Sequence, residues 1–115
     1  MFCRRVKMSI HMAMRLVVTE TEAPRGLRLV GELDVSTSRE LALFLDPKLV
    51  EGGDVTLDVS SLTFMDSTGL QVLIRSAIAL SGRGRVIVKS PGNLVRSILD
   101  LAIRTDKIDS LVVED

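Results

Sequence analysis

The stretch LTFMDSTGLQVLI, residues 62–74, decides the fold because it joins an apolar strand to an apolar helix. The strand is predicted over residues 55–59, and the helix begins near Ser67. Apolar residues then recur at helical spacing and predict one buried stripe: Leu70, Leu73, Ile74, Ala77 and Ile78. We expect the helix to end at Ser81-Gly82, because Gly82 can adopt the left-handed conformation beyond the last turn.

A carboxylate and a hydroxyl group stand at this joint, on Asp66 and Ser67. A short side-chain oxygen at the start of a helix can accept hydrogen bonds from the free amides of the first turn, so either residue can be the cap. Ser67 is therefore either a structural cap or the acceptor of a chemical modification. Val72 and Ala79 are expected to lie off the buried stripe and to be candidate partner contacts, as is Arg75 on the solvated face.

The composition is that of one globular domain. The chain has 115 residues, of which 46% are hydrophobic and 26% are charged. A net charge of +0 and an aromatic content of 3% argue against a nucleic-acid binder, which needs a positive surface and stacking side chains. The single cysteine favours a reducing cytoplasm, and no apolar run is long enough to cross a membrane.

The first 14 residues differ from the rest of the chain. They are basic and hold four of the five methionines, yet they lack the continuous apolar stretch of a secretory signal. We expect residues 1–14 to be a flexible leader, followed by a single domain over residues 15–115.

Strands and helices alternate along that domain. Besides residues 55–59, strands are predicted over residues 15–19, 27–33, 85–89 and 108–113. A first helix is expected to start with a capping box between Thr37 and Glu40, to carry Leu41, Leu43, Phe44 and Leu45 on its apolar face, and to end or bend at Asp46-Pro47. A third helix is expected to open near Asn93.

This alternation predicts an α/β fold with a mostly parallel sheet of about five strands, its first strand antiparallel, and helices packed on it. The loops at the carboxyl ends of parallel strands share one edge of the sheet, and functional groups collect there. The loops over residues 32–37 and 60–69 should therefore meet, so that Asp34 and Ser67 become neighbours.

The chain lacks the residues and motifs that common classes of enzyme need. There is no glycine-rich phosphate loop, and the only histidine, His11, lies in the predicted leader, which leaves no Ser–His–acid triad in the domain. Residues 66–69 are not a nucleophile elbow, because Met65 stands where that motif needs glycine. One cysteine and one histidine leave no ordinary metal site, so we expect none.

Two motifs, GELD at residues 31–34 and MDSTGL at residues 65–70, resemble those of the STAS family, which includes domains of sulfate transporters and bacterial anti-sigma-factor antagonists. The resemblance spans residues 15–113. It implies a STAS-type fold and a cytoplasmic regulator of transcription that acts by partner switching on a sigma factor.

The resemblance also implies roles for residues at the joint. Ser67 would be phosphorylated by an anti-sigma factor that is itself a serine kinase consuming ATP, and a serine phosphatase would reverse the step. Thr68 is a minor alternative acceptor, and the chain needs no cofactor of its own. The implied docking surface comprises Asp34, Asp66, Ser67, Thr68, Gly69, Val72 and Arg75.

Two other functions remain open at this point. The first is a STAS adaptor subunit of a transporter or lipid-trafficking complex, which has no need of an acceptor hydroxyl. The second is a nucleotide-binding module, which the missing phosphate loop disfavours. Family members often carry a further helix after the last strand, and its absence here permits dimerisation or truncation. We expect a monomer or a weak homodimer.

Overall fold

This computed structural model describes residues 15–115, so the predicted leader lies outside the described residues. Five strands form one sheet in the order β1-β2-β3-β4-β5, in which β1 is antiparallel to β2 and the other pairs are parallel. The predicted fold class is confirmed. In chain order the elements are β1 (Leu16–Glu22), β2 (Arg25–Leu33), α1 (Ser38–Glu51), β3 (Val55–Met65), α2 (Ser67–Leu80), β4 (Val86–Lys89), α3 (Asn93–Asp106) and β5 (Leu111–Glu114).

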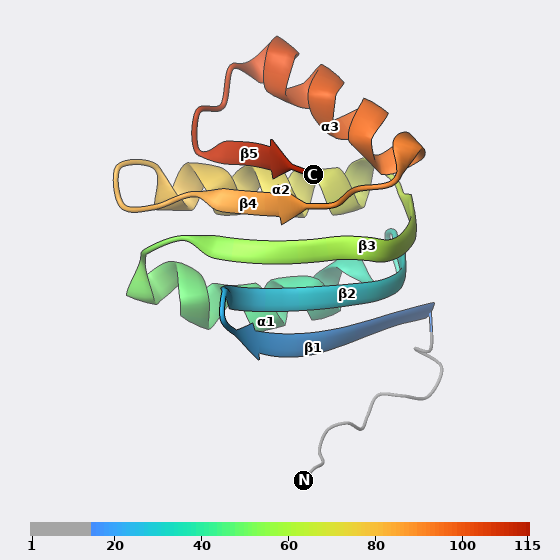
Figure 1. Ribbon diagram of the computed structural model, residues 1–115, viewed down its shortest axis with the longest axis horizontal. Coiled ribbons are helices and arrows are strands. Elements are labelled where there is room, and N and C mark those ends of the chain that lie inside the picture. The colour runs from blue at the N-terminus through green and yellow to red at the C-terminus, as the bar shows by residue number, and fades with distance from the viewer. Residues whose placement is uncertain (1–14) are drawn as a thin grey trace, which may run out of the picture.

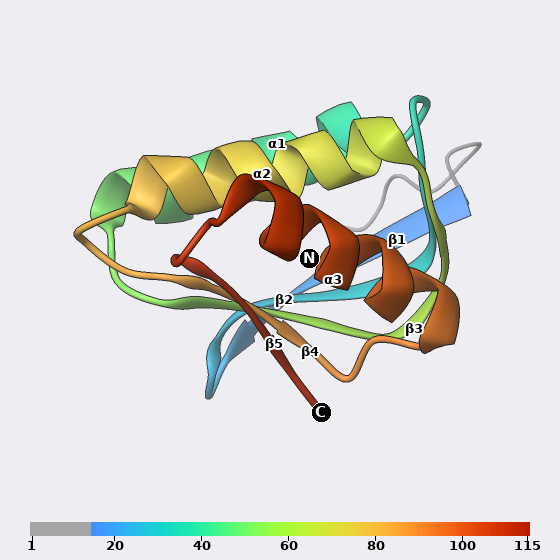
Figure 2. The ribbon, with the colours of Figure 1, turned by 90° about the horizontal axis from the view of Figure 1, so that it is seen from above.

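The sheet and the helices form two layers (Figure 1). All three helices lie on the same side of the sheet when the molecule is seen from above (Figure 2). Alternating strand residues point toward the helices, so that Leu27, Leu57 and Val88 are fully buried while the next residue of each strand faces the other side. The core therefore lies between the sheet and its single helical layer.

The first helix differs from its prediction at both ends. Thr37 is its N-cap but makes no side-chain capping bond, so the predicted capping box is wrong. Its hydroxyl instead donates to the carbonyl of Glu32 and accepts from the amide of Asp34, which stabilises the turn before the helix. Pro47 lies inside α1 and does not end it, because the helix continues to Glu51.

Two arginines bind the far ends of α1 and α2. Arg25 donates to the carbonyl of Lys48, and Arg83 donates to the carbonyls of Leu49 and Ala79. The last carbonyls of a helix have no partner within the helix, so a cation there satisfies them and opposes the helix dipole. These contacts support the last turn of α1 beyond Pro47, where proline removes one helical hydrogen bond.

Several residues differ in burial from their predictions. The third strand is longer than predicted and reaches Met65, which is buried as expected, whereas Phe64, also expected in the core, is 40% exposed. The sequence pattern predicts buried positions for Leu43 and Ile78, yet they are 66% and 58% exposed. The helices pack on the sheet through narrower apolar stripes than the sequence pattern suggests, because each contacts the sheet along only one side.

Candidate functional site

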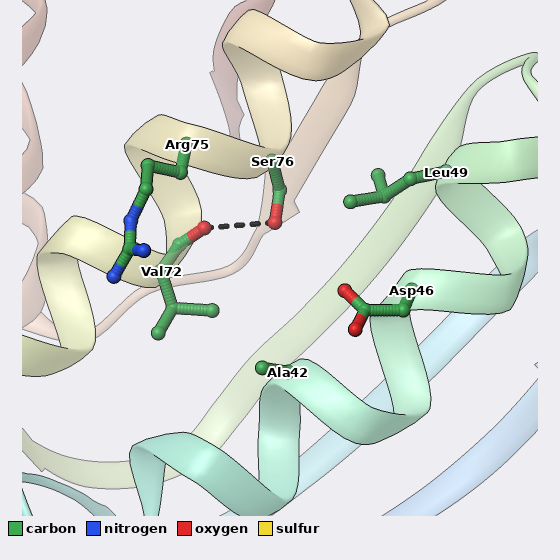
Figure 3. A pocket seen from close by; sticks show the side chains of 6 residues that line it. All are labelled: Ala42, Asp46, Leu49, Val72, Arg75 and Ser76. Atoms are coloured by element: carbon green, nitrogen blue, oxygen red, sulfur yellow. Dashed lines mark hydrogen bonds between the residues drawn. The ribbon is translucent and has the colours of Figure 1, made fainter.

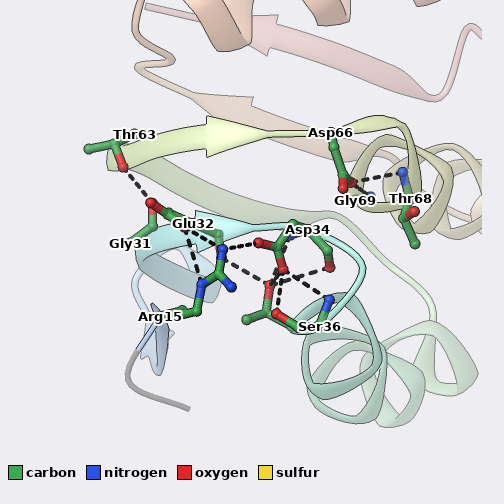
Figure 4. Close-up of polar contacts among 10 residues, drawn as sticks. Arg15, Gly31, Glu32, Asp34, Ser36, Thr63, Asp66, Thr68 and Gly69 are labelled. Carbon is green, nitrogen blue, oxygen red and sulfur yellow. Dashed lines mark hydrogen bonds and ion pairs between the residues drawn. The ribbon is translucent and has the colours of Figure 1, made fainter. Parts of the chain in front are cut away.

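The joint between β3 and α2 is built around the carboxylate of Asp66. Its Oδ1 accepts hydrogen bonds from the amides of Thr68 at 2.9 Å and Gly69 at 3.0 Å (Figure 4). Asp66 is the N-cap of α2, which settles the choice between it and Ser67. Ser67 is exposed as the first residue of the helix, and its hydroxyl makes no hydrogen bond to any residue in the described range 15–115.

Replacing Asp66 with Ala should destabilise the fold by about 1 kcal/mol, because two amides of the first turn lose their acceptor. Thermal unfolding followed by circular dichroism measures this loss. Ser67→Ala is the matched control at the next position and should change stability by less than about 0.5 kcal/mol, since that hydroxyl holds no structural bond. Equal losses in the two variants would contradict the assignment of the cap.

The end of β2 lies against the start of α2. The amide of Asp66 donates to the carbonyl of Leu33 at 3.1 Å, and Gly69 packs on the Leu33 side chain, where an added Cβ would lie 2.6 Å from Leu33 Cγ. Asp34 directly follows Leu33, the acceptor of this hydrogen bond, and Ser67 directly follows Asp66, its donor. The predicted meeting of the two loops at one edge is therefore present, and Asp34 and Asp66 share it (Figure 4).

Asp34 holds the β2–α1 turn in place. Its side chain is 9% exposed and accepts from the Ser36 hydroxyl at 2.7 Å, the Ser36 amide at 2.9 Å and the Arg15 guanidinium at 2.6 Å. The Ser36 hydroxyl is the largest cause that lowers the pKa of Asp34 below its ordinary value, followed by the Ser36 amide and the charge of Arg15, while burial opposes them. Arg15 also pairs with Glu32 at 2.8 Å.

We expect Asp34→Asn to reduce stability at pH 7 and to reduce it less as the pH falls. The folded protein lowers the pKa of Asp34, so the carboxylate stabilises the fold above the unfolded pKa of about 3.9, and this contribution is lost as the pH falls through the lower folded value. Thermal melts of both proteins between pH 7 and pH 3 measure the difference. A difference in melting temperature that stays constant over this range would contradict the role of the charge.

The exposed side of α2 continues from Ser67. Gln71, Arg75 and Ile78 follow at helical spacing and are exposed. The expectation that Val72 lies off the buried stripe is wrong: it is 8% exposed and belongs to the core. Val72 follows Gln71 directly, so its side chain points about 100° further around the helix axis and contacts α1.

A hollow of about 240 Å³ lies between α1 and α2. Figure 3 shows that Asp46 of α1 and Arg75 of α2 stand at it from opposite helices, and it is also lined by Ala42, Leu49, Val72 and Ser76. Ligand pockets for small molecules are usually 300–1,000 Å³ and enclosed, so this hollow suits a partner's side chain better than a metabolite.

Three exposed residues of this surface are not among the residues predicted from the sequence to contact a partner. Val35, in the turn after Asp34, is 73% exposed, and Gln71 and Ile78 lie on the exposed side of α2. For the two helical residues the signal was available, because counting three or four positions onward from Ser67 leads to them. Val35 offered no such signal beyond being an apolar residue between polar ones.

Thr68 is half-buried and Gly69 is buried, so of the predicted docking residues on α2 only Ser67 and Arg75 are well exposed. Residues 15–115 contain no group of three or more potential metal-ligating side chains. None of the helices α1, α2 and α3 in this part of the chain is long and apolar enough to cross a membrane.

The chain belongs to the STAS family. The family described as “Mlab, STAS domain” matches residues 16–111, which include both motifs, strands β1 to β4 and the first residue of β5. No curated protein sequence matches the chain.

Two solved structures share this fold. One is a putative anti-sigma factor antagonist from Thermotoga maritima, with a TM-score of 0.66 and 20% identity over 87% of this chain and 86% of that chain. The other is the anti-sigma factor antagonist SpoIIAA in its unphosphorylated form, with a TM-score of 0.65 and 20% identity over 87% of each chain. At this level of identity the likeness concerns the fold.

Proposed function

We propose that this protein is an anti-sigma factor antagonist that regulates transcription by partner switching, under the control of phosphorylation of Ser67 by a cognate anti-sigma serine kinase. The unphosphorylated chain binds the anti-sigma factor, which then releases its sigma factor. Phosphorylation ends the binding, and a serine phosphatase restores it. The proposal assigns the chain no catalysis, no cofactor and a place in the cytoplasm, with ATP consumed by the partner.

The observation that carries the proposal is that Asp66, and not Ser67, caps α2. Asp66 caps the helix, so the Ser67 hydroxyl is exposed and holds no structural bond that modification would break. A kinase can reach this oxygen without unfolding the first turn of α2. Of the two structural neighbours, one is a putative anti-sigma factor antagonist, and the other is an anti-sigma factor antagonist whose name specifies its unphosphorylated form.

A phosphate on Ser67 would remain directed toward the partner. It adds a charge of about −1.5 to −2 at neutral pH. The start of a helix usually accommodates an anion through its free amides, but Asp66 already occupies those of Thr68 and Gly69. With Asp34 at the same edge, the added charge joins a negative surface and obstructs docking directly.

Incubation with candidate anti-sigma kinases and ATP, followed by mass spectrometry of the modified peptide, tests the proposal. We expect one phosphate on Ser67 and loss of binding to the kinase afterwards. The Ser67→Ala variant is the control and should bind the kinase without gaining phosphate, while Thr68→Ala should leave phosphorylation intact. Phosphate found only on another residue would refute the assignment.

A STAS adaptor subunit of a transporter or lipid-trafficking complex is the second candidate. Exposed apolar residues on the helical layer favour it, since a permanent subunit needs an apolar contact surface: Leu43 and Val50 on α1 are 66% and 81% exposed, and Ile78 on α2 is 58% exposed. Pull-down with an anti-sigma kinase on one side and a transporter ATPase on the other separates the two functions.

A further inference from the structure

The face of the sheet that carries no helix presents a row of alternating charges. Arg28 of β2 pairs in register with Asp58 of β3, Asp58 with Lys89 of β4, and Lys89 with Glu114 of β5. Residues in register on neighbouring strands point to the same side. Across four strands the row therefore reads positive, negative, positive, negative.

This row points away from the core. The preceding residues Leu27, Leu57 and Val88 are fully buried against the helices, and successive side chains of a strand alternate between the two faces. In Figure 1 the strands stand in front of α1 and α2, so the view is onto this bare face. No hydrogen bond or ion pair joins the four charged side chains to one another within residues 15–115, although Arg28 and Lys89 both contribute to lowering the pKa of Asp58, after its bonds from Ser60.

A second row of residues lies two positions earlier on each strand, and its side chains are small or apolar. Gly26 of β2 pairs with Thr56, Thr56 with Ile87, and Ile87 with Val112. None of these residues carries a charge, and only Thr56 carries a polar side chain. Thr56 and Ile87 are each only 8% exposed, so the charged row, and not this strip, supplies the accessible side chains of this part of the bare face.

We infer that the bare face binds a second copy of this chain, sheet against sheet, around a two-fold axis that runs parallel to the strands between β3 and β4. Such an axis exchanges β2 with β5 and β3 with β4, but it leaves each row opposite itself. Arg28 then faces Glu114 of the partner subunit, and Asp58 faces Lys89 of the partner subunit. All four contacts in the row join opposite charges.

The charge pattern selects this axis over the alternative. A two-fold axis in the plane of contact but perpendicular to the strands would place each strand on its own copy, so that Arg28 meets a second arginine and Asp58 a second aspartate. Like charges facing each other at an interface cost several kcal/mol. Because two twisted sheets pack with their strands about 30° apart, the contacts are closest near the axis, at Asp58 and Lys89.

The dimer leaves the candidate site accessible. Rotation about an axis parallel to the strands keeps their direction, so the carboxyl edges of both sheets, and both Ser67 residues, stand at the same end of the assembly. The helical layers lie on the two outer sides. The inference therefore stands apart from the proposed function, and its failure would leave that function untouched.

Charge exchange between two variants tests the inference. Asp58→Lys alone sets lysine against lysine in the dimer, and Lys89→Asp alone sets aspartate against aspartate, so each should raise the dissociation constant of the dimer at least about tenfold. Mixing the two variants restores opposite charges at both contacts and should return association to about the wild-type level. Sedimentation velocity at roughly 1 μM to 1 mM protein, the range of weak association, measures all three.

The mixing experiment shows whether a variant fails to associate because it lost contacts between chains or because its own fold is damaged. Mixing can restore contacts between two chains, but it cannot repair a damaged fold. Asp100→Lys, an exposed position on α3 with the same change of charge, is the control and should leave the dissociation constant unchanged. Wild-type association should also weaken as salt screens the row. A monomeric wild type, a dimer unaffected by either single variant, or variants that stay monomeric when mixed would each overturn the inference.

Discussion

Replacing Ser67 with Asp should lower the affinity of the chain for the proposed anti-sigma partner about a hundredfold, whereas Ser67→Ala should bind about as well as the wild type. The proposed docking surface offers an exposed, neutral hydroxyl at this position, and in the proposed complex a carboxylate there would be buried against the partner without a counter-ion. An unpaired charge at an interface costs about 2–5 kcal/mol, of which 2.7 kcal/mol corresponds to about a hundredfold. Isothermal titration calorimetry with the purified partner measures both constants.

Ser81→Asp is the control for that substitution. It changes the same residue type, but at the C-cap that follows the opposite end of α2, about 21 Å away at 1.5 Å per residue. It should leave the affinity within about threefold of the wild type, because the charge lies far beyond the docking surface. Equal affinities for the wild type and Ser67→Asp would remove the physical basis of the proposed switch.

Replacing Gly69 with Ala should destabilise the fold by about 2 kcal/mol, even though alanine is the better helix former by about 1 kcal/mol. An added Cβ would lie 2.6 Å from Leu33 Cγ, 2.9 Å from Cδ2 and 3.0 Å from the Leu33 carbonyl oxygen. The helix would have to move away from β2, and the edge that carries Ser67 would move with it. Urea unfolding measures the stability, and binding of the same partner should weaken as well.

Gly92→Ala provides the matched control for Gly69→Ala. Gly92 is the N-cap of α3, its φ of −70° suits any residue, and nothing lies within 4 Å of an added Cβ. This variant should lose only about 0.5 kcal/mol, the difference between glycine and alanine at a cap. In addition, Leu33→Ala should cost less in the Gly69→Ala background than in the wild type, because it removes the colliding side chain. Additive losses would contradict the predicted contact.

Local chemistry predicted the parts of the fold that depend on neighbouring residues. The joint at Asp66 and Ser67, the end of α2 near Gly82 and the opening of α3 at Asn93 are confirmed, because caps and left-handed glycines act within one turn. The mostly parallel sheet with an antiparallel first strand followed from the alternation of strands and helices, which permits few topologies.

What the sequence could not predict depends on contacts across the fold. Pro47 does not end α1, one of the two outcomes expected of it: the helix continues to Glu51, and Arg25 and Arg83, distant in sequence, bind the carbonyls of the following turn. Val72 is buried because α1 lies beside it, and no pattern within α2 reveals on which side the neighbouring helix packs. Roles at the site, by contrast, came from the STAS motifs and remain predictions.

The arginine contacts at the far ends of α1 and α2 also determine how the helix pair can deform. Arg83 joins the carbonyls of Leu49 and Ala79 across the two helices, at the end of α2 opposite Ser67. One side chain thus bridges the carboxyl ends of both helices, so a displacement of α1 at this end would carry the end of α2 with it.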